Sequence, residues 1–442
     1  MSELQAERPA PVEELAPPRR GDPSAWIRNQ LREPYLQLLA SQLLTACVAL
    51  VANVLMARAM TPTGRGEVAL MLQVVYLATQ VLLLGTERSF VASYHDVSPA
   101  AAVRAYARLL LIPCGLSLTA AAVFAVAAPE HLNPGPAVVA MLACYAIVEC
   151  ASLATRAIAV AAGRVHEFLC CRVIESLLLL ATLVGLFLAQ ISRPSVWILG
   201  YLFSGAVPTI VYIVIWLRLP ATGVTEVAPG QNRLVRREGL TLFPAALSNM
   251  AMLRADRLAL PALASTSALG LYASVATMTE LLAWPPRAYA DSRLGRWRAT
   301  HRDGGLNARP LIVAAAVYAL VVTPILAGAL YLLIVPVLGV RYAPAKAVVL
   351  PLVAAAGLYA VSRVSLGLLI AKGHAALVSA AEITGFVVSF AAYLLLIPDY
   401  GILGAAYGSL LGYGACLIFA IVATTKITGR RAAMPVAPGQ AP

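Results

Sequence analysis

The chain has 442 residues, of which 60% are hydrophobic and only 12% are charged. Soluble domains carry about 25% charged residues, so this composition excludes a soluble globular protein and indicates a chain embedded in lipid. The net charge of +12 would suit a nucleic-acid-binding protein, but the basic residues are scattered among short loops, and we expect no nucleic-acid partner.

The two ends of the chain are poor in long apolar runs. Residues 1–33 contain "ERPAPVEELAPPRRGDPSAW" and lack the apolar centre of a signal peptide, so we expect a disordered cytoplasmic tail. Residues 428–442 have a similar composition, and we interpret them in the same way.

Twelve apolar runs lie between these tails, each near the roughly 20 residues that a membrane-spanning helix needs. The alternating pattern of barrel strands does not occur in them. The sequence therefore predicts an all-α polytopic membrane protein with a six-helix bundle at residues 34–218, a cytoplasmic linker at 219–239 and a second six-helix bundle at 240–427. The predicted runs cover residues 35–57, 67–87, 105–128, 137–160, 173–191, 196–217, 240–263, 268–289, 310–336, 347–370, 376–397 and 401–425.

Basic residues are distributed unevenly between the two sides of the predicted bundle. With the N-terminus inside, the inner segments hold most of them, including a basic loop from Arg287 to Arg309. Cytoplasmic loops are enriched in Lys and Arg, so both termini are predicted to be cytoplasmic. We expect the basic loop to attract anionic membrane lipids. The outer segments hold only Arg58, Arg65, Arg193, Arg341 and Lys346.

The two predicted bundles share a weak internal repeat. The stretch "TPTGRGEVAL" (61–70) aligns with "STSALGLYAS" (265–274), and "ISRPSVWILGYLFSG" (191–205) aligns with "LLIPDYGILGAAYGS" (395–409). Each half begins on the same side of the membrane, so the repeats are parallel. A pseudo-two-fold axis along the membrane normal follows, which is typical of transporters with a substrate site between the halves.

Three stretches of the chain resemble a known family. These are "VLMARAMTPTGRGEVALML" (54–72), "DRLALPALASTSALGLYASVATMTE" (256–280) and "LLIPDYGILGAAYGSLLGY" (395–413). They are similar to the polysaccharide-biosynthesis membrane proteins of bacteria, the oligosaccharide flippase branch of a superfamily that includes lipid II flippases and multidrug and toxic-compound extrusion transporters. The resemblance extends over residues 30–427.

The resemblance implies a flippase that works by alternating access. Its implied substrate is a polyprenyl-diphosphate-linked oligosaccharide or a related cell-envelope glycolipid, moved from the inner to the outer leaflet for lipopolysaccharide or exopolysaccharide export. Glycosyltransferases or a polymerase of the same pathway are the implied partners. The excess of arginine over lysine suggests a bacterial genome, so we expect the bacterial cell membrane as the location.

Three charged residues in the seventh predicted helix are the main candidates for substrate binding. Arg254 and Arg257 are three residues apart and share a helix face, whereas Asp256 points about 100° away from Arg257. Asp256 therefore cannot neutralise both arginines, and we expect uncompensated positive charge for a diphosphate, which guanidinium groups bind in bidentate fashion. The alternative is a structural Asp–Arg pair that fixes this helix to a neighbour.

Two further arginines are candidates for the substrate path. Arg88 lies at the inner end of the second predicted helix, where it is either a head-group contact or a snorkelling anchor. Arg58 lies at the outer mouth of the first helix, where it is either part of the exit route or a surface residue.

The internal repeat also contains a pair of opposite charges in each half. Arg156 and Glu175 recur as Arg363 and Glu382, each pair joining the fourth and fifth helices of its half. We expect salt bridges that fix helix geometry. The alternative is an inner gate that parts when the cavity opens inward.

Glu280 and Glu149 lie in the middle of apolar helices and are candidates for ion coupling. A desolvated carboxyl group binds a proton near neutral pH, and it can equally bind Na⁺. A structural role is the alternative, and the membrane potential is a third driving force.

The sequence lacks the common motifs of ATPases, serine hydrolases and zinc proteases. It has no GxxxxGK[ST], GxSxG or HExxH motif, and its seven cysteines lack metal-ligand spacing. We therefore predict no enzyme activity, catalytic residue, metal site or cofactor. Two other functions stay open: a multidrug or organic cation exporter of the same fold, and a membrane polymerase acting on lipid-linked sugars.

Overall fold

The computed structural model describes residues 34–94, 97–127, 135–219, 230–302 and 305–432. These residues form helices joined by short connections, and none of them belongs to a β-strand. The predicted tail at 1–33 lies outside the described residues, as do residues 220–229 of the predicted linker and residues 433–442 at the end.

Five of the seven helices in the N-terminal half begin with proline. Proline suits a first helical position because its fixed φ matches the helix and its missing N–H would have no partner there. At the start of α3, Thr61 also caps the helix by accepting a bond from the Gly64 amide. The helices are α2 (Pro34–Ala59), α3 (Pro62–Leu83), α4 (Thr86–Ser93), α5 (Pro99–Ala127), α6 (Pro136–Ala161), α7 (Val165–Leu188) and α8 (Pro194–Arg218).

The C-terminal half repeats this order with two short 3₁₀ segments, η1 and η2. Its first helix begins at Gln231, before the predicted start near residue 240. The elements are α9 (Gln231–Leu263), α10 (Thr266–Thr279), η1 (Glu280–Ala283), α11 (Trp284–Arg302), α12 (Ala308–Leu338), η2 (Val340–Val348), α13 (Val349–Ala371), α14 (Ala375–Tyr400) and α15 (Ile402–Ala432).

Every predicted apolar run corresponds to a helical segment, which confirms an all-α, multi-pass membrane fold. Within the described ranges, nine helices are long and apolar enough to cross a membrane by themselves. The other three runs fall on α2, whose apolar part is Leu43–Ala59, on the charged α9, and on the interrupted α10 and α11.

Two predicted runs are not continuous helices. The second is interrupted at Leu84 and Gly85, which both adopt positive φ, before α4 begins. The eighth changes to the 3₁₀ turn η1 just before Pro285 and Pro286, because proline cannot donate the backbone bond that continues an α-helix.

The basic segment from Arg287 to Arg309, expected as a loop, is largely helical. It continues α11 as far as Arg302. Ala290 and Trp297 are buried on one side of α11, in a small core that includes Leu368 of α13. This apolar side packs α11 against the bundle. The contact could not be predicted from the sequence because arginines dominate the composition of the segment.

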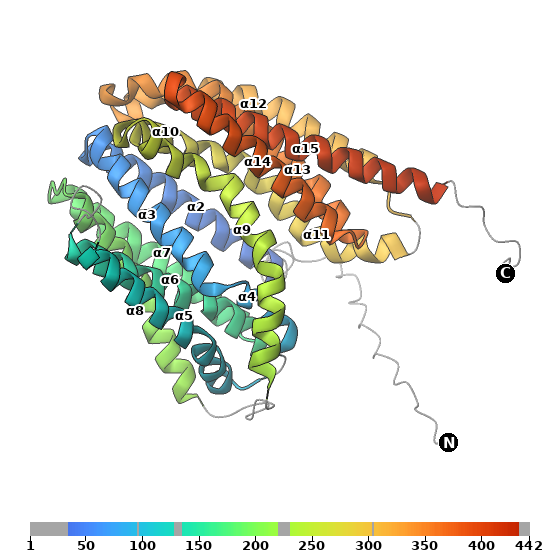
Figure 1. Cartoon of the computed structure of the whole chain (residues 1–442), viewed down its shortest axis with the longest axis horizontal. Helices are drawn as coiled ribbons and strands as arrows, with labels where there is room; N and C mark the ends of the chain where they lie inside the picture. Colours follow the sequence, from blue (N-terminus) through green and yellow to red (C-terminus); the bar gives the residue numbers. More distant parts are fainter. Residues whose placement is uncertain (1–33, 95–96, 128–134, 220–229, 303–304, 433–442) are drawn as a thin grey trace, which may run out of the picture.

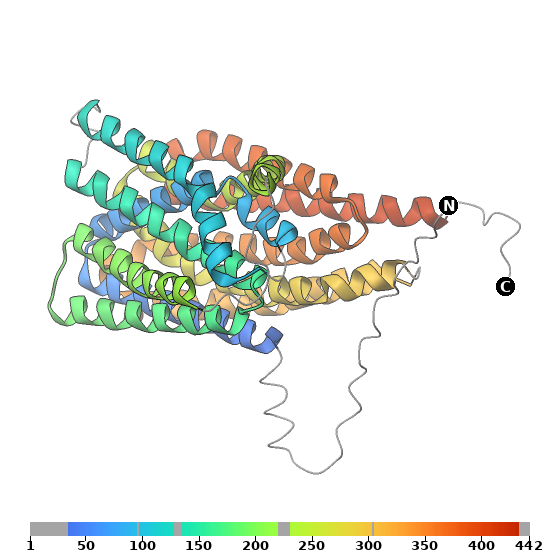
Figure 2. The ribbon, with the colours of Figure 1, turned by 90° about the horizontal axis from the view of Figure 1, so that it is seen from below.

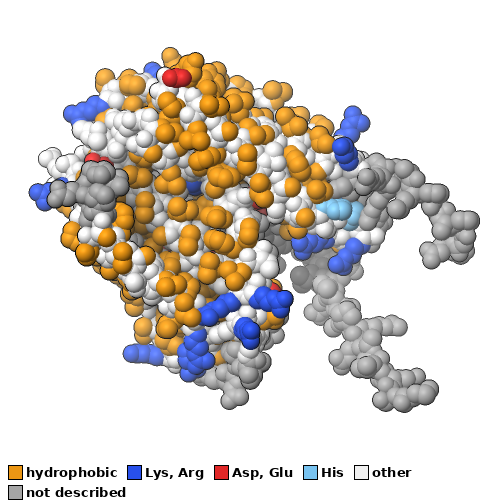
Figure 3. Space-filling view, viewed as in Figure 1, with side chains coloured by type: hydrophobic (Ala, Val, Ile, Leu, Met, Phe, Trp, Pro, Cys, Tyr) orange, Lys and Arg blue, Asp and Glu red, His pale blue; other side chains and the backbone are white. Residues whose placement is uncertain are grey.

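The two halves lie side by side with nearly separate hydrophobic cores (Figures 1 and 2). We call the end of the bundle where α2 begins and α15 ends the tail face, and the opposite end the far face. Figure 1 shows the halves in contact where α3 passes α10 and diverging toward α4 and α11. On the face shown in Figure 3, apolar side chains are spread over the surface between the ends and charged side chains lie mainly near the ends, as a lipid environment requires.

Two glycines allow the halves to meet at the far face. A Cβ atom on Gly66 of α3 would lie 1.9 Å from the Thr266 carbonyl oxygen, and one on Gly270 of α10 would lie 1.8 Å from the Pro62 carbonyl oxygen. No side chain fits at such distances, so the backbones of the two halves are in direct contact.

We expect Gly66→Ala and Gly270→Ala each to separate α3 from α10 and to lower the melting temperature by about 5 °C, the scale of an overpacked contact. Gly115→Ala is the matched control, because a Cβ atom there meets nothing within 4 Å. Thermal unfolding of the purified variants measures the effect. Equal melting temperatures for all three variants would contradict the close contact.

Candidate functional site

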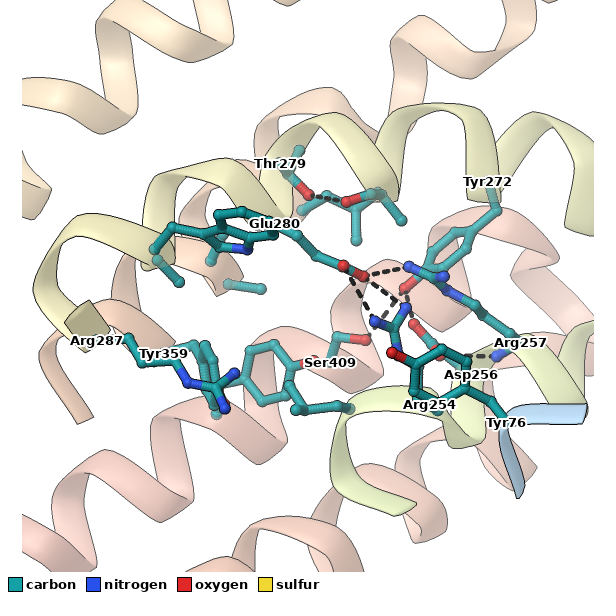
Figure 4. Close-up of a pocket in the computed structure, with 18 of the residues that line it drawn as sticks. Tyr76, Arg254, Asp256, Arg257, Tyr272, Thr279, Glu280, Arg287, Tyr359 and Ser409 are labelled. Atoms are coloured by element: carbon teal, nitrogen blue, oxygen red, sulfur yellow. Dashed lines mark hydrogen bonds and ion pairs between the residues drawn. The ribbon is translucent and has the colours of Figure 1, made fainter. Parts of the chain in front are cut away.

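A cavity of about 360 Å³ lies between the two halves. The N-terminal half supplies Tyr76 and Arg156, and the C-terminal half supplies most of the wall. Arg287 and Asp291 of α11 mark its tail-face end, where they form an exposed ion pair with a 3.9 Å separation. The labelled lining residues in Figure 4 are Tyr76, Arg254, Asp256, Arg257, Tyr272, Thr279, Glu280, Arg287, Tyr359 and Ser409.

Two arginines share one carboxylate on the wall of this cavity. The Arg254 guanidinium donates to Glu280 in bidentate fashion, with N–O distances of 2.9 and 3.2 Å. Arg257 donates to the same carboxylate through Nη2. The side chains are partly exposed to the cavity, with 23% of Arg254, 13% of Arg257 and 36% of Glu280 accessible. We call these three residues the Arg–Glu triad (Figure 4).

The expectation of uncompensated charge at Arg254 and Arg257 is wrong in one respect. Both guanidinium groups already have a counter-ion, because the end of α10 brings Glu280 opposite the shared face of α9. The three formal charges nevertheless sum to +1. Glu280, interpreted from the sequence as an ion-coupling candidate, is a bound counter-ion in this structure.

Asp256 belongs to a separate buried network, as its angle on the helix predicts. Its carboxylate accepts from the Tyr272 hydroxyl at 2.6 Å and from the Arg257 backbone N–H at 2.7 Å. The Tyr272 and Ser409 hydroxyls are 3.2 Å apart, and Ser409 also contacts Tyr393 at 2.8 Å. Asp256 therefore joins α9 to α10 and, through Tyr272, to α15.

One contact links the triad to the other half of the molecule. The guanidinium carbon of Arg254 lies 5.6 Å from the centroid of the Tyr76 ring on α3. A cation over an aromatic face is attracted by the ring quadrupole. This contact therefore couples α3 electrostatically to the charge on α9.

One of the two repeated ion pairs is confirmed. Arg363 of α13 binds Glu382 of α14 with an N–O distance of 3.0 Å, and Asn249 of α9 donates to the same carboxylate at 2.7 Å. Both charged side chains are largely buried. The pair therefore fixes α13 and α14 relative to each other and to α9.

The predicted pair of Arg156 with Glu175 is wrong. Glu175 is bound by Arg172, which lies three residues earlier on the same helix, at 2.8 Å. Arg156 is exposed and lines the cavity instead. A partner one turn away needs no second helix to position it, which gives Arg172 the advantage.

The remaining candidates from the sequence are not gathered at the triad. Glu149 is partly exposed, forms no ion pair with the described residues and lies within electrostatic range of Arg172. Arg58 donates to the carbonyls of Pro336 and Val337, the latter at 2.7 Å, so it caps the end of α12 at the far face. The side chain of Arg88 lies outside the described residues.

The aromatic lining of the cavity and one buried cation were not predicted from the sequence. Tyr76, Tyr272 and Tyr359 line the cavity. Arg65, expected in an outer loop, is only 4% exposed in α3. Its neighbour Gly66 carried the available signal, because a glycine in a helix often marks a close helix contact that would bury adjacent residues.

The revised pairing of Glu175 predicts a difference between two arginine variants. Arg172→Met leaves Glu175 without its counter-ion and should lower the stability by on the order of 2 kcal/mol. Arg156→Met removes an exposed side chain and should change it by less than about 0.5 kcal/mol. Chemical unfolding of both purified variants measures the difference, and an equal loss in both would restore Arg156 as the partner.

Comparisons with known proteins place this fold. No protein-family model and no curated protein matches the chain. An inward-facing multidrug resistance transporter of the MATE family and MOP superfamily matches with a TM-score of 0.66 and 16% identity, over 88% of this chain and 96% of that one. The lipid II flippase MurJ, in an inward closed conformation, matches with a TM-score of 0.64 and 10% identity, over 87% of each chain.

A third solved structure differs in conformation. An outward-facing MATE family transporter of the same superfamily matches with a TM-score of 0.57 and 15% identity, over 90% of this chain and 96% of that one. The chain therefore has the fold of the MOP superfamily transporters.

Proposed function

We propose that the protein is a flippase for a polyprenyl-diphosphate-linked oligosaccharide or a related anionic glycolipid of the cell envelope. It works by alternating access between the two six-helix halves. The observation that carries the proposal is the Arg–Glu triad, in which two guanidinium groups on the cavity wall share a single carboxylate.

The triad suits a diphosphate because its counter-ion is internal and replaceable. A diphosphate offers several anionic oxygens, and guanidinium groups bind such oxygens in parallel pairs while staying charged at every accessible pH. Glu280 keeps both arginines satisfied when the site holds no substrate, which avoids the cost of an unpaired buried charge. An arriving phosphate group replaces this carboxylate and brings more negative charge.

The rest of the cavity suits sugars. Aromatic faces pack against the apolar faces of sugar rings, and tyrosine hydroxyl groups add hydrogen bonds. Tyr76, Tyr272 and Tyr359 provide such groups around the triad. The Tyr359 hydroxyl is buried and has no hydrogen-bond partner among the described atoms. The polyprenyl chain would stay in lipid between the halves.

We infer the orientation in the membrane from the charge distribution. The positive-inside rule favours a cytoplasmic tail face, and the cavity reaches this face beside Arg287. We propose a bacterial cell membrane as the location and the glycosyltransferases or polymerase of the pathway as partners. Coupling to H⁺, Na⁺ or the membrane potential provides the driving force, with Glu149 as the candidate for ion binding because it has no ion-pair partner in the described chain.

An organic cation exporter is the second candidate, favoured by the carboxylates of Glu280 and Asp256 on the cavity wall. Both carboxylates are already occupied, by the two arginines and by Tyr272. The balance of charge at the triad therefore favours an anionic substrate.

Arg254→Ala and Arg257→Ala should each lower flipping at least tenfold while the protein still folds. Each removes charge-assisted hydrogen bonds of about 1.5–3 kcal/mol to the phosphate groups. Arg257→Lys should restore flipping only in part, since an ammonium group cannot form a planar fork. The measurement is the transfer of a fluorescent polyprenyl-diphosphate sugar between leaflets of proteoliposomes. Arg193→Ala, at an exposed position, is the control. Unchanged flipping in both alanine variants would refute the phosphate site.

Glu280→Gln separates the two candidate functions. For a flippase, we expect tighter binding of undecaprenyl diphosphate to the purified variant, because the competing carboxylate is gone, and no export of ethidium by either protein. For a cation exporter, the unmodified chain exports ethidium and Glu280→Gln loses this activity. The second pattern would replace the flippase proposal.

A further inference from the structure

Arg65 is a buried cation with an incomplete set of partners. It lies on α3 with 4% of its surface exposed, and its Nη2 donates to the Asn53 side-chain oxygen at 2.9 Å. Its Nε and Nη1 atoms are buried and have no hydrogen-bond partner among the described residues. The formally charged group that acts on it electrostatically is another cation, Arg257.

A purely structural role does not account for this arrangement. Burying a charge is costly unless it is paired and all its donors are satisfied, and an apolar side chain of similar volume is usually at least as stable. Arg65 donates one hydrogen bond, to the oxygen of a neutral amide, and experiences repulsion from Arg257. Burying the Arg65 charge in the present conformation costs free energy, which indicates that this residue acts in a different conformation.

The position of Arg65 shows which conformation this is. It precedes Gly66, where the backbones of α3 and α10 touch at the far face. Its partner Asn53 on α2 donates across the same boundary to the Ser274 carbonyl of α10 at 2.8 Å. Parting of the halves at the far face would expose Arg65 and release the Asn53 amide from Ser274. Both groups belong to the N-terminal half, so they would stay together as they open.

We propose that Arg65 and Asn53 form a second anion site, which binds the phosphate head group of the substrate when the far face is open. The inference rests on the proposed function and adds the release side of the path. In the closed state two donor atoms of Arg65 have no partner in the part of the chain that the structure describes, and in the open state these donors and the Asn53 amide would face the cavity. The head group passes from the triad on α9 to a guanidinium on α3.

The first test compares stability with transport in Arg65→Met. A release site predicts a melting temperature equal to or above that of the parent chain, because an unpaired buried charge is removed, together with at least a fivefold loss of flipping in proteoliposomes. Arg65→Lys should keep part of the flipping. Arg193→Met, at an exposed position in the other outer segment, is the matched control, and its flipping should stay within twofold of the parent. A melting temperature clearly below that of the parent would make Arg65 a structural pin and overturn the proposal.

The second test measures binding of undecaprenyl diphosphate to purified protein in two backgrounds. In the parent chain, Arg65→Met should change the dissociation constant by less than twofold. In Gly270→Ala, which separates α3 from α10, it should weaken binding about tenfold. Opening is measured by labelling Ser274→Cys with a water-soluble maleimide. The labelling of the native cysteines in the parent chain is subtracted as background. Equal effects of Arg65→Met in both backgrounds would overturn the release site.

Two further binding measurements distinguish the release site from the flippase site and identify the ligand group. Arg254→Ala should weaken binding in the parent chain whatever Arg65 does, so normal binding there refutes the flippase site alone. Inorganic diphosphate replaces the lipid in a parallel titration of Gly270→Ala. Competition by inorganic diphosphate that disappears in Arg65→Met supports recognition of the phosphate group itself. Competition that persists in Arg65→Met overturns the proposed contact.

Discussion

The Glu280 carboxylate holds both arginines of α9 on the wall of the cavity, and the geometry of the site depends on this contact. Two cations can share a low-dielectric cavity only if an anion lies between them. The anion comes from the end of α10, where the helix changes to a 3₁₀ turn ahead of two prolines. The interruption of this helix is therefore part of the site, since it positions the carboxylate.

The closed far face is the second constraint, and it is made of backbone rather than side chains. Gly66 and Gly270 bring α3 and α10 into direct contact, while the apolar cores of the two halves remain nearly separate. A boundary with little shared core can open without repacking either half. The buried Arg65 lies at this boundary, and its Nε and Nη1 atoms have no hydrogen-bond partner among the described residues.

The pairing of charges shows how far sequence analysis reaches. The repeat correctly joined Arg363 to Glu382, because both lie on helices that each half places together. The same repeat failed for Glu175, where Arg172 competes from one turn away. Helical angles correctly separated Asp256 from the shared face of Arg254 and Arg257. No local pattern could bring Glu280 to that face, because it follows the connection between two helices.

The sequence by itself determined that this chain spans a membrane as helices, because long apolar runs in lipid must satisfy their backbone hydrogen bonds within each segment. It also determined the two-half order and the location of charge in α9. Only the tertiary structure decided which carboxylate neutralises the arginines, that Arg65 is buried, and that Tyr76 faces Arg254. These outcomes depend on how separate helices approach one another, and helix packing is set by small residues and turns rather than by the periodicity of any single run.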